Sequence, residues 1–301
     1  MTIDSVEPFL IKAKNENKTL GQIMIEHEAE IQETEPEKVI TAMKRIWIVM
    51  VDSIIRGVKI DQKSPSGMSG GNAKKILERE KKGKTLSGSQ ILKVAARAIG
   101  VGEYNSSMGT IVAAPTAGSA GVVPAVVYTV AETCKAPEEA IIRGLFASAL
   151  IGLVCDAKAS TSGSEHGCQA EIGVSAAMAS AAAVEIAGGT AEQAVNAAAL
   201  TLKNTLGLAC DPVAGLVEVP CIKRNGLLAA EAMIAADLSL CGVESIIPFD
   251  DVVSAMDEIG QMLPTAIKET SEGGLATTKT GRGYKNWLKR TGLHQMSGDE
   301  E

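Results

Sequence analysis

The chain has 301 residues, and 46% of them are hydrophobic, which is enough for a sizeable core in one large domain or two ordinary ones. A formal net charge of -7 argues against a general nucleic-acid or anionic-membrane binder, because those partners require a surplus of lysine and arginine. The first residues contain neither a basic segment nor a long apolar one, so we expect a soluble cytoplasmic protein that handles a small molecule.

The amino-terminal part of the chain, up to about residue 110, is rich in charge. EHEAEIQETEPEKV (26–39) and KKILEREKKGK (74–84) predict solvated helices joined by Gly and Ser loops, with His27 on a solvated face. Residues 111–220 contain only four basic and ten acidic residues. We expect this low-charge segment to be the buried part of the protein.

Helix boundaries are marked by their capping residues. Pro137 and the two glutamates after it predict a helix start before AIIRGLFASALIGLV, since proline tolerates the first turn and acids suit the positive end of the helix dipole. Thr190 and Gln193 predict a capping box. The glycine pair 188–189 predicts the end of an Ala-rich helix that begins at Cys168.

The fold class predicted from these elements is all-α. A further helix, VVSAMDEIGQML, starts after Pro248, and only GTIVAAP (109–115) and GVVPAVV (121–127) suggest short strands. No fixed-period repeat or low-complexity linker divides the chain. We therefore expect residues 1–301 to form one compact Ala/Gly-rich catalytic domain, with a charge-rich helical part at about 1–110 and a buried core at about 111–281.

Six cysteines in a cytoplasmic chain of this size are not expected to form a disulfide framework. Cys168, Cys210 and Cys221 each lie beside a glycine or proline that breaks regular structure, where a thiol can point into a cavity and backbone N–H groups can stabilise a thiolate. They are either small buried hydrophobes or metal ligands. Burial without a metal role is expected for the three cysteines in apolar helical runs: Cys134, Cys155 and Cys241.

Three cysteine ligands would have a specific chemical consequence. An electron-transfer iron–sulfur protein uses four cysteines, so that the coordination of every iron is completed by a protein ligand. Three would leave one iron open, and an open iron is a Lewis acid that can polarise a substrate hydroxyl, as a catalytic zinc does through its free position.

Any one of the three loops rich in Gly and Ser is better explained alone as a simple turn, but three of them around one apolar core favour a small, polar, anionic ligand. Residues 66–71 precede a helix start, where free N–H groups favour a carboxylate or phosphate. Neither GxxxxGK[ST] nor GxGxxG occurs. The predicted substrate-binding residues are Ser66, Gly67, Met68, Ser69, Gly70, Gly71, Asn105, Ser106, Ser107, Thr116, Ala117, Gly118, Ser119 and Gly121.

Long motifs between about residues 64 and 281 identify a resemblance. SGMSGGNA, NSSMGTIVAAPTAGSAGVVPAV, GSEHGCQAEIGVSAAMA, NTLGLACDPVAGLVEVPCIKRN and GGLATTKTG resemble the alpha chain of the oxygen-sensitive, iron–sulfur-dependent L-serine dehydratases. The resemblance implies a mainly helical catalytic domain, a [4Fe-4S] cluster on Cys168, Cys210 and Cys221, and Ser and Gly loops around the substrate. Because these three cysteines differ in their surroundings from the three in helical runs, we expect them to be the only protein ligands of the cluster. It also implies β-elimination of water from L-serine to give pyruvate and ammonia.

Two features qualify the resemblance. Single-chain members of the family end in a cysteine that can occupy the open iron, whereas this sequence ends in LHQMSGDEE, so we do not expect that self-capping. The second domain of those members is missing as well, which resembles the two-subunit branch, where a separate beta chain completes the enzyme.

The base that removes the Cα proton is not assignable from the sequence. Glu165, His166 and Lys223 are local candidates, and a beta-chain residue is another; His166 is also consistent with a simple turn histidine. His27 and His294 are assigned no role.

Three other functions remain open. A cysteine desulfidase could use the same cluster to expel sulfide, and turnover of serine against cysteine separates the two. A pyridoxal-phosphate enzyme would need alternating strands, which the pattern lacks, and would show a Schiff-base absorbance. A non-catalytic helical subunit would contain no iron after anaerobic purification.

Overall fold

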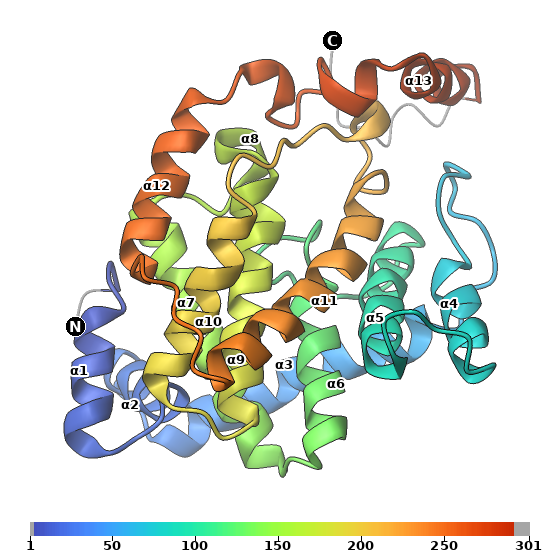
Figure 1. Cartoon of the computed structure of the whole chain (residues 1–301). Helices are drawn as coiled ribbons and strands as arrows, with labels where there is room; N and C mark the ends of the chain where they lie inside the picture. The colour runs from blue at the N-terminus through green and yellow to red at the C-terminus, as the bar shows by residue number, and fades with distance from the viewer. Residues whose placement is uncertain (1–2, 292–301) are drawn as a thin grey trace.

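Helix α9 (Val174–Ile186) occupies the centre of the computed structural model, which describes residues 3–291 (Figure 1). All 13 of its residues are buried. A helix that is buried on every side must be surrounded by other helices. Those that pack against it are α6 (Val122–Cys134), α7 (Glu138–Lys158), α10 (Ala191–Asn204) and α11 (Cys221–Leu240).

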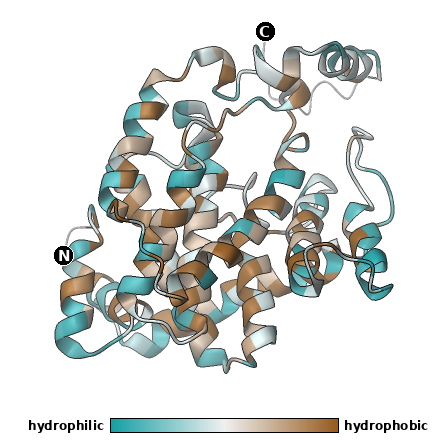
Figure 2. Cartoon of the chain, viewed as in Figure 1, coloured by the Kyte–Doolittle hydropathy of each residue, from teal (hydrophilic) through white to brown (hydrophobic). Residues whose placement is uncertain are grey.

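The other helices surround this core. They are α1 (Glu7–Glu16), α2 (Leu20–Ile31), α3 (Pro36–Gly57), α4 (Asn72–Lys81), α5 (Ser89–Ser106), α8 (Gly163–His166), α12 (Phe249–Met262) and α13 (Lys279–Thr291). Short turns are the π-helical η1 (Gln169–Gly173) and the 3₁₀ turns η2 (Val213–Gly215), η3 (Thr265–Ile267) and η4 (Gly274–Thr277). Apolar residues concentrate in the middle, and α4 and α13 at the edge are mostly polar (Figure 2).

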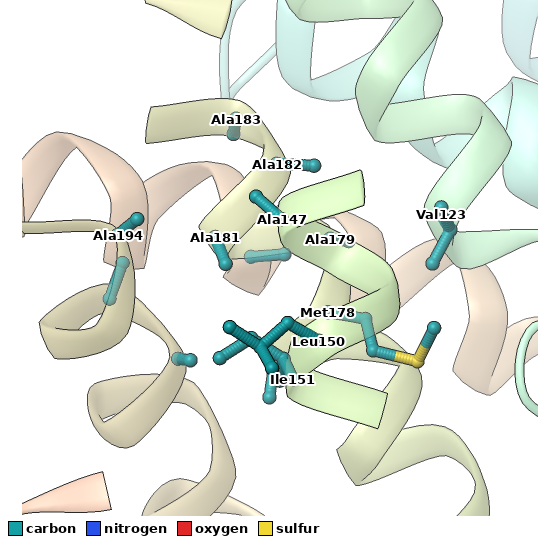
Figure 3. Packing of buried hydrophobic residues seen from close by; sticks show 14 of the residues in the cluster. Val123, Ala147, Leu150, Ile151, Met178, Ala179, Ala181, Ala182, Ala183 and Ala194 are labelled. Carbon is teal, nitrogen blue, oxygen red and sulfur yellow. The ribbon is translucent and has the colours of Figure 1, made fainter. Parts of the chain in front are cut away.

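Packing of α9 against α7 depends on small side chains. Ala147 of α7 and Ala182 of α9 lie near each other, to one side of the larger side chains of Leu150, Ile151 and Met178 (Figure 3). Because alanine keeps the helix axes close, a larger residue on α7 would collide with α9: a Cβ on Gly144 would lie 2.7 Å from the Ile186 side chain. The Ala-rich composition thus determines how closely the helices approach.

Most of the predicted helix boundaries are confirmed. Pro137 precedes the first turn of α7, and Pro248 precedes α12. The capping box at the start of α10 is present, with the Gln193 N–H donating to Thr190 Oγ1 at 3.2 Å and the Thr190 N–H donating to Gln193 Oε1 at 3.0 Å. Gly188, with a φ of +84°, follows the end of α9.

The two predicted strands are wrong. Residues 109–115 form no strand, and GVVPAVV lies at the start of α6. Val122 to Val127 are all buried, so the run has no alternation, and a continuous apolar run cannot distinguish a buried helix from a buried strand. Pro124 lies in the first turn, where proline is tolerated. Within residues 3–291 the all-α prediction holds, with one isolated parallel bridge, Cys210–Lys268.

Helix α7 is apolar and long enough, at 21 residues, to cross a membrane. In the structure, however, 67% of its most apolar stretch is buried, largely by α2 and α9. Its hydropathy is therefore explained by its position in the core of the bundle.

His27 does not lie on a solvated face as the sequence analysis expected. Its side chain is 1% exposed, and both ring nitrogens lack a hydrogen-bond partner among the described residues. The ring packs edge-on against Phe9, with the centroids 5.0 Å apart. The flanking glutamates concealed this position, because α2 buries one side, which includes Ile23, Met24 and His27. Burial lowers the pKa of His27 below its usual 6.5.

This buried histidine predicts acid sensitivity. Because the pKa of His27 is lower in the folded chain, the unfolded chain takes up a proton first as the pH falls below 6.5. The stability present above pH 6.5 is therefore lost below it. We expect urea unfolding to give a smaller pH dependence between about pH 7.5 and 5.5 for His27→Leu than for the natural chain. Equal pH dependence in the two proteins would contradict this assignment.

Candidate metal centre

The three cysteines singled out in the sequence come from three separate segments at one end of the bundle, toward α8 and α13 in Figure 1. Cys168 caps η1, Cys221 is the first residue of α11, and Cys210 lies in the connection before η2. Their exposures are 3%, 7% and 2%, and none forms a disulfide.

The segment around Cys210 is fixed by backbone pairing. The Cys210 N–H donates to the Ile267 carbonyl at 2.9 Å, and the Glu269 N–H donates to the Cys210 carbonyl at 2.8 Å. This bridge joins the connection before η2 to the segment that follows α12. It places the Cys210 thiol within the protein although the residue belongs to no helix.

Glu171, which the sequence analysis missed, lies with two of the cysteines. A carboxylate oxygen of Glu171 and the Sγ atoms of Cys168 and Cys210 all lie within 4.8 Å of one another. Thr116 Oγ1 donates to Glu171 Oε1 at 2.6 Å, and the Cys210 thiol faces Oε2 at 3.8 Å. A sequence signal existed, because Glu171 is the only charged residue between 167 and 184.

The thiols and the carboxylate influence one another's protonation. A hydrogen bond from the Cys210 thiol lowers the pKa of Cys168, and the Arg224 guanidinium adds to that effect against desolvation. Burial raises the pKa of Cys221, with the nearby Cys168 as a further cause. Burial also raises the pKa of Glu171, although its hydrogen bonds oppose this. Cys168 is therefore the thiol that is most easily deprotonated, whereas Cys221 and Glu171 lose their protons less readily than usual.

Arg224 connects the Cys210 segment to α11. Its guanidinium donates to the Ala209 carbonyl at 2.8 Å and lies 3.3 Å from the Asp211 carboxylate. Asp211 in turn accepts from the Leu275 N–H at 2.8 Å. The GGLATTKTG motif is thereby held beside Cys210.

The serines of the first Gly/Ser loop surround a buried glutamate, Glu218, which is 6% exposed. Ser64 and Ser66 donate to its two carboxylate oxygens at 2.6 Å each, and Ser69 donates as well. Glu218 lies three residues before Cys221. Its carboxylate therefore joins the serine loop to the segment that carries that cysteine.

The start of α4 already holds a carboxylate from the protein. Glu103 is fully buried and accepts from the N–H groups of Gly70, Asn72 and Ala73 at 2.9 to 3.2 Å, and from the Asn72 amide at 2.6 Å. Gly71 caps the helix with a φ of +77°. The sequence analysis expected an external anion at this helix start; in the structure those N–H groups are used by Glu103.

The three Gly/Ser loops lie together. Ser69 Oγ is 3.1 Å from Ser106 Oγ, and Asn105 Nδ2 donates to the Ala117 carbonyl at 3.5 Å. The hydroxyls of Ser106 and Ser107 both donate to the Glu103 carbonyl, at 3.0 and 2.8 Å. The loops at 66–71, 105–107 and 116–121 thus form one surface.

Asn225, a second residue missed in the sequence, attaches the third loop to α11. Its amide donates to the Gly118 carbonyl at 2.7 Å and to the Cys221 carbonyl at 2.9 Å, and its oxygen accepts from the Gly121 N–H at 2.9 Å. Ser119 is fully buried and contacts Thr116 at 3.1 Å between their hydroxyl oxygens. Thr116 and Asn225 therefore link the loop to both the Glu171 and Cys221 sides of the site.

The three base candidates have different surroundings. Glu165 is exposed and accepts from Ser160 at 2.5 Å. His166 Nε2 lies 2.8 Å from Asp257 on α12, while its Nδ1 is buried without a partner in the part of the chain that the structure describes. Lys223 is half-buried in the first turn of α11.

The remaining cysteines differ in part from expectation. Cys155 is fully buried in α7, as expected. Cys134 and Cys241 are exposed, because they stand at the carboxyl ends of α6 and α11, where the apolar stripes end. The tail residues 292–301, which bear on self-capping and on His294, lie outside the described residues.

Comparison with known proteins gives consistent matches. A family model described as the serine dehydratase alpha chain matches residues 15–276. The chain is 47% identical over 278 residues to the probable L-serine dehydratase alpha chain of Bacillus subtilis, covering 92% of each protein. It is 43% identical over 260 residues to the L-serine dehydratase alpha chain of Peptoniphilus asaccharolyticus, covering 86% of this chain and 89% of that one. Over 238 residues it is 37% identical to L-serine dehydratase TdcG of Escherichia coli, covering 77% of this chain and 52% of that protein.

The Glu218 cluster predicts a measurable loss of stability. Glu218→Gln replaces one acceptor oxygen by an amide donor and removes the charge that the serine hydroxyls solvate. We expect the free energy of unfolding in urea to fall by about 1.5–3 kcal/mol. The control is Glu258→Gln at an exposed position of α12, for which a change within about 0.5 kcal/mol is expected. Equal effects of the two substitutions would show that the cluster does not hold the loop.

Proposed function

The chain belongs to the serine dehydratase alpha-chain family, and from this we propose that it converts L-serine to pyruvate and ammonia with a [4Fe-4S] cluster. The reaction is elimination of water to give 2-aminoacrylate, which tautomerises and hydrolyses. The observation that carries the proposal is the position of the Cys168 and Cys210 thiols, which lie within 4.8 Å of each other and of the Glu171 carboxylate. A third buried thiol, Cys221, is close enough for Cys168 to affect its protonation, and none of the three is in a disulfide.

The residues suit a thiolate-held iron–sulfur group. Cys168, Cys210 and Cys221 supply sulfur donors, the type that such clusters use. Space beside Cys210 is kept clear by Gly163: a Cβ there would lie 3.1 Å from the Cys210 sulfur and 2.7 Å from Glu171 Oε2. When bound by three cysteines, the group supplies an iron with an open position that acts as a Lewis acid toward the substrate hydroxyl.

The Ser and Gly loops are proposed to surround the substrate. Ser64, Ser66 and Ser69 already donate their hydroxyl protons to Glu218, so their oxygens have only lone pairs left to offer. Such acceptors suit the substrate ammonium group rather than its carboxylate. The bare backbone of residues 116–121, next to Glu171, is the better source of N–H groups for the carboxylate.

His166 is the candidate whose surroundings best suit the base. Asp257 accepts from Nε2, which leaves the Nδ1 lone pair free to take the Cα proton. Glu165 is exposed, and Lys223 and a beta-chain residue remain the alternatives.

A separate beta chain is the proposed partner. The Bacillus and Peptoniphilus relatives are named alpha chains, and the Escherichia protein is about twice as long as the region matched. Segments that carry the motifs also expose apolar side chains: Met108 is 82% exposed, Leu275 42% and Val217 36%. We propose that the beta chain docks over these loops, so that residues 1–301 act as one catalytic domain within a hetero-oligomer.

The first prediction concerns the three proposed cysteine ligands. Changing Cys168, Cys210 or Cys221 to Ser, one at a time, should abolish the iron–sulfur absorbance after anaerobic reconstitution, together with pyruvate formation from serine. Cys155→Ser, buried in α7, and Cys134→Ser, exposed on α6, are the controls and should retain both. Loss of the cluster in a control but not in the three variants would refute the ligand set.

The second prediction concerns the beta chain and air. An iron that no cysteine holds is the one most readily lost to oxidants, so activity should fall in air and return after ferrous iron and thiol are added. Serine turnover should be full only when both chains are co-expressed, and L-cysteine should be the poorer substrate. An air-stable chain that dehydrates serine at full rate alone would exclude both the open iron and the need for a partner.

A further inference from the structure

Glu171 lies where a fourth protein donor to the metal group would be. Its carboxylate and the thiols of Cys168 and Cys210 lie within 4.8 Å of one another. From this geometry we infer that Glu171 is a fourth protein ligand, which occupies the open position of the cluster while no substrate is bound. The inference rests on the proposed function and extends the ligand set beyond the three cysteines.

The carboxylate is oriented by one partner and left available on its other side. Thr116 donates to Oε1 at 2.6 Å, while Oε2 faces the Cys210 thiol at 3.8 Å. One oxygen is therefore fixed and the other is directed at the sulfurs. Since Thr116 belongs to a loop proposed to bind substrate, arrival of serine and release of Glu171 can be coupled through this hydrogen bond.

The charge of Glu171 is not balanced by its hydrogen-bond partners. Both Thr116 and the Cys210 thiol are neutral groups. Arg224 acts on Glu171 only through space and is engaged with Asp211, 3.3 Å away. Buried charges in proteins are paired or bind metals, so a half-buried carboxylate in this position is suited to a metal cation.

The other buried carboxylates of the site show the contrast. Glu218 accepts from three serine hydroxyls, and Glu103 from three backbone N–H groups and an amide. A carboxylate has about four acceptor sites, so those two are nearly saturated. Glu171 accepts one short hydrogen bond and keeps the greatest acceptor capacity of the three.

The local structure keeps room around this carboxylate. Glu171 is the middle residue of the π-helical turn η1, a rare conformation that is frequent at functional sites. Glycines stand on two sides of it: a Cβ on Gly163 would lie 2.7 Å from Oε2, and one on Gly118 would lie 3.2 Å from Oε1. A side chain at either position would push the carboxylate away from the thiols.

The test compares two substitutions matched in environment. Glu171→Gln keeps the size and the hydrogen bond from Thr116 but removes the anionic ligand. Glu231→Gln is the control, because Glu231 is also half-buried and accepts from one neutral group, the Asn204 amide at 2.9 Å, ten residues along α11 from Cys221. The full chains are reconstituted anaerobically with ⁵⁷Fe(II) and sulfide, and Mössbauer spectra and the rate of iron release in air are recorded with and without L-serine.

Without serine, Glu171→Gln should change the Mössbauer parameters of one iron and release it on the order of 10-fold or more faster than the natural chain, since the loss of even an outer-shell partner of a metal ligand typically lowers metal affinity by about 10- to 100-fold. With saturating serine the two release rates should converge, because the substrate then occupies the position. Glu231→Gln should match the natural chain in both conditions.

The opposite results are equally clear. If Glu171→Gln holds four irons with an unchanged spectrum and release rate, Glu171 is not a ligand, while the proposed function stands. A natural chain that takes up no iron overturns the proposed function and this inference together. Should Glu171→Gln fail to fold, Thr116→Val decides. It keeps all four proposed metal ligands and removes the orienting hydrogen bond to Glu171, together with the hydroxyl contact to Ser119, and an unchanged release rate would overturn the inference.

Discussion

The complete burial of α9 is the constraint on which the rest of the structure depends. All 13 residues of this helix are buried and most of its side chains are alanine or serine, so it can only lie inside a ring of helices, and its small side chains allow α7 and α10 to approach closely (Figure 3). The polar side chains along its length are few and are bonded within the protein: Ser175 donates to the Ala114 carbonyl, Ser180 to the Ala177 carbonyl, and Glu185 meets Arg143 at 3.4 Å. The chemistry is therefore confined to its amino end, where Cys168 and Glu171 precede the first α-helical turn.

At that end, buried carboxylates hold irregular loops that no regular hydrogen-bond ladder supports. Glu218 gathers the serines of residues 64–69, Glu103 satisfies the start of α4, and Asp211 fixes the segment at Leu275. Each carboxylate satisfies donors that would be costly to bury unpaired. The loops owe their shape to these long-range contacts, which span between about 30 and 154 residues along the chain.

These long-range contacts also explain what the sequence could and could not predict. Pro137, the Thr190 box and the glycines after α9 act locally, so their motifs identify helix ends without knowledge of the fold. The cysteines were recognised by the irregular residues beside them. Glu171, Glu218 and Asn225 were missed because their roles depend on partners 55 to 154 residues away. His27 and the run at 121–127 misled for a related reason: burial is decided by neighbouring helices, not by the adjacent residues.

The same internal bonding explains why the loops present an apolar outer surface. Ser66, Thr116 and Asn225 direct their polar atoms inward to carboxylates and carbonyls, so little hydrogen-bonding capacity is left to face outward. The residues that do face outward on these segments include Met108 and Leu275. These exposed apolar side chains are the ones that the proposed beta chain would cover. Satisfying the buried carboxylates from within thus produces a loop surface better suited to a protein partner than to water.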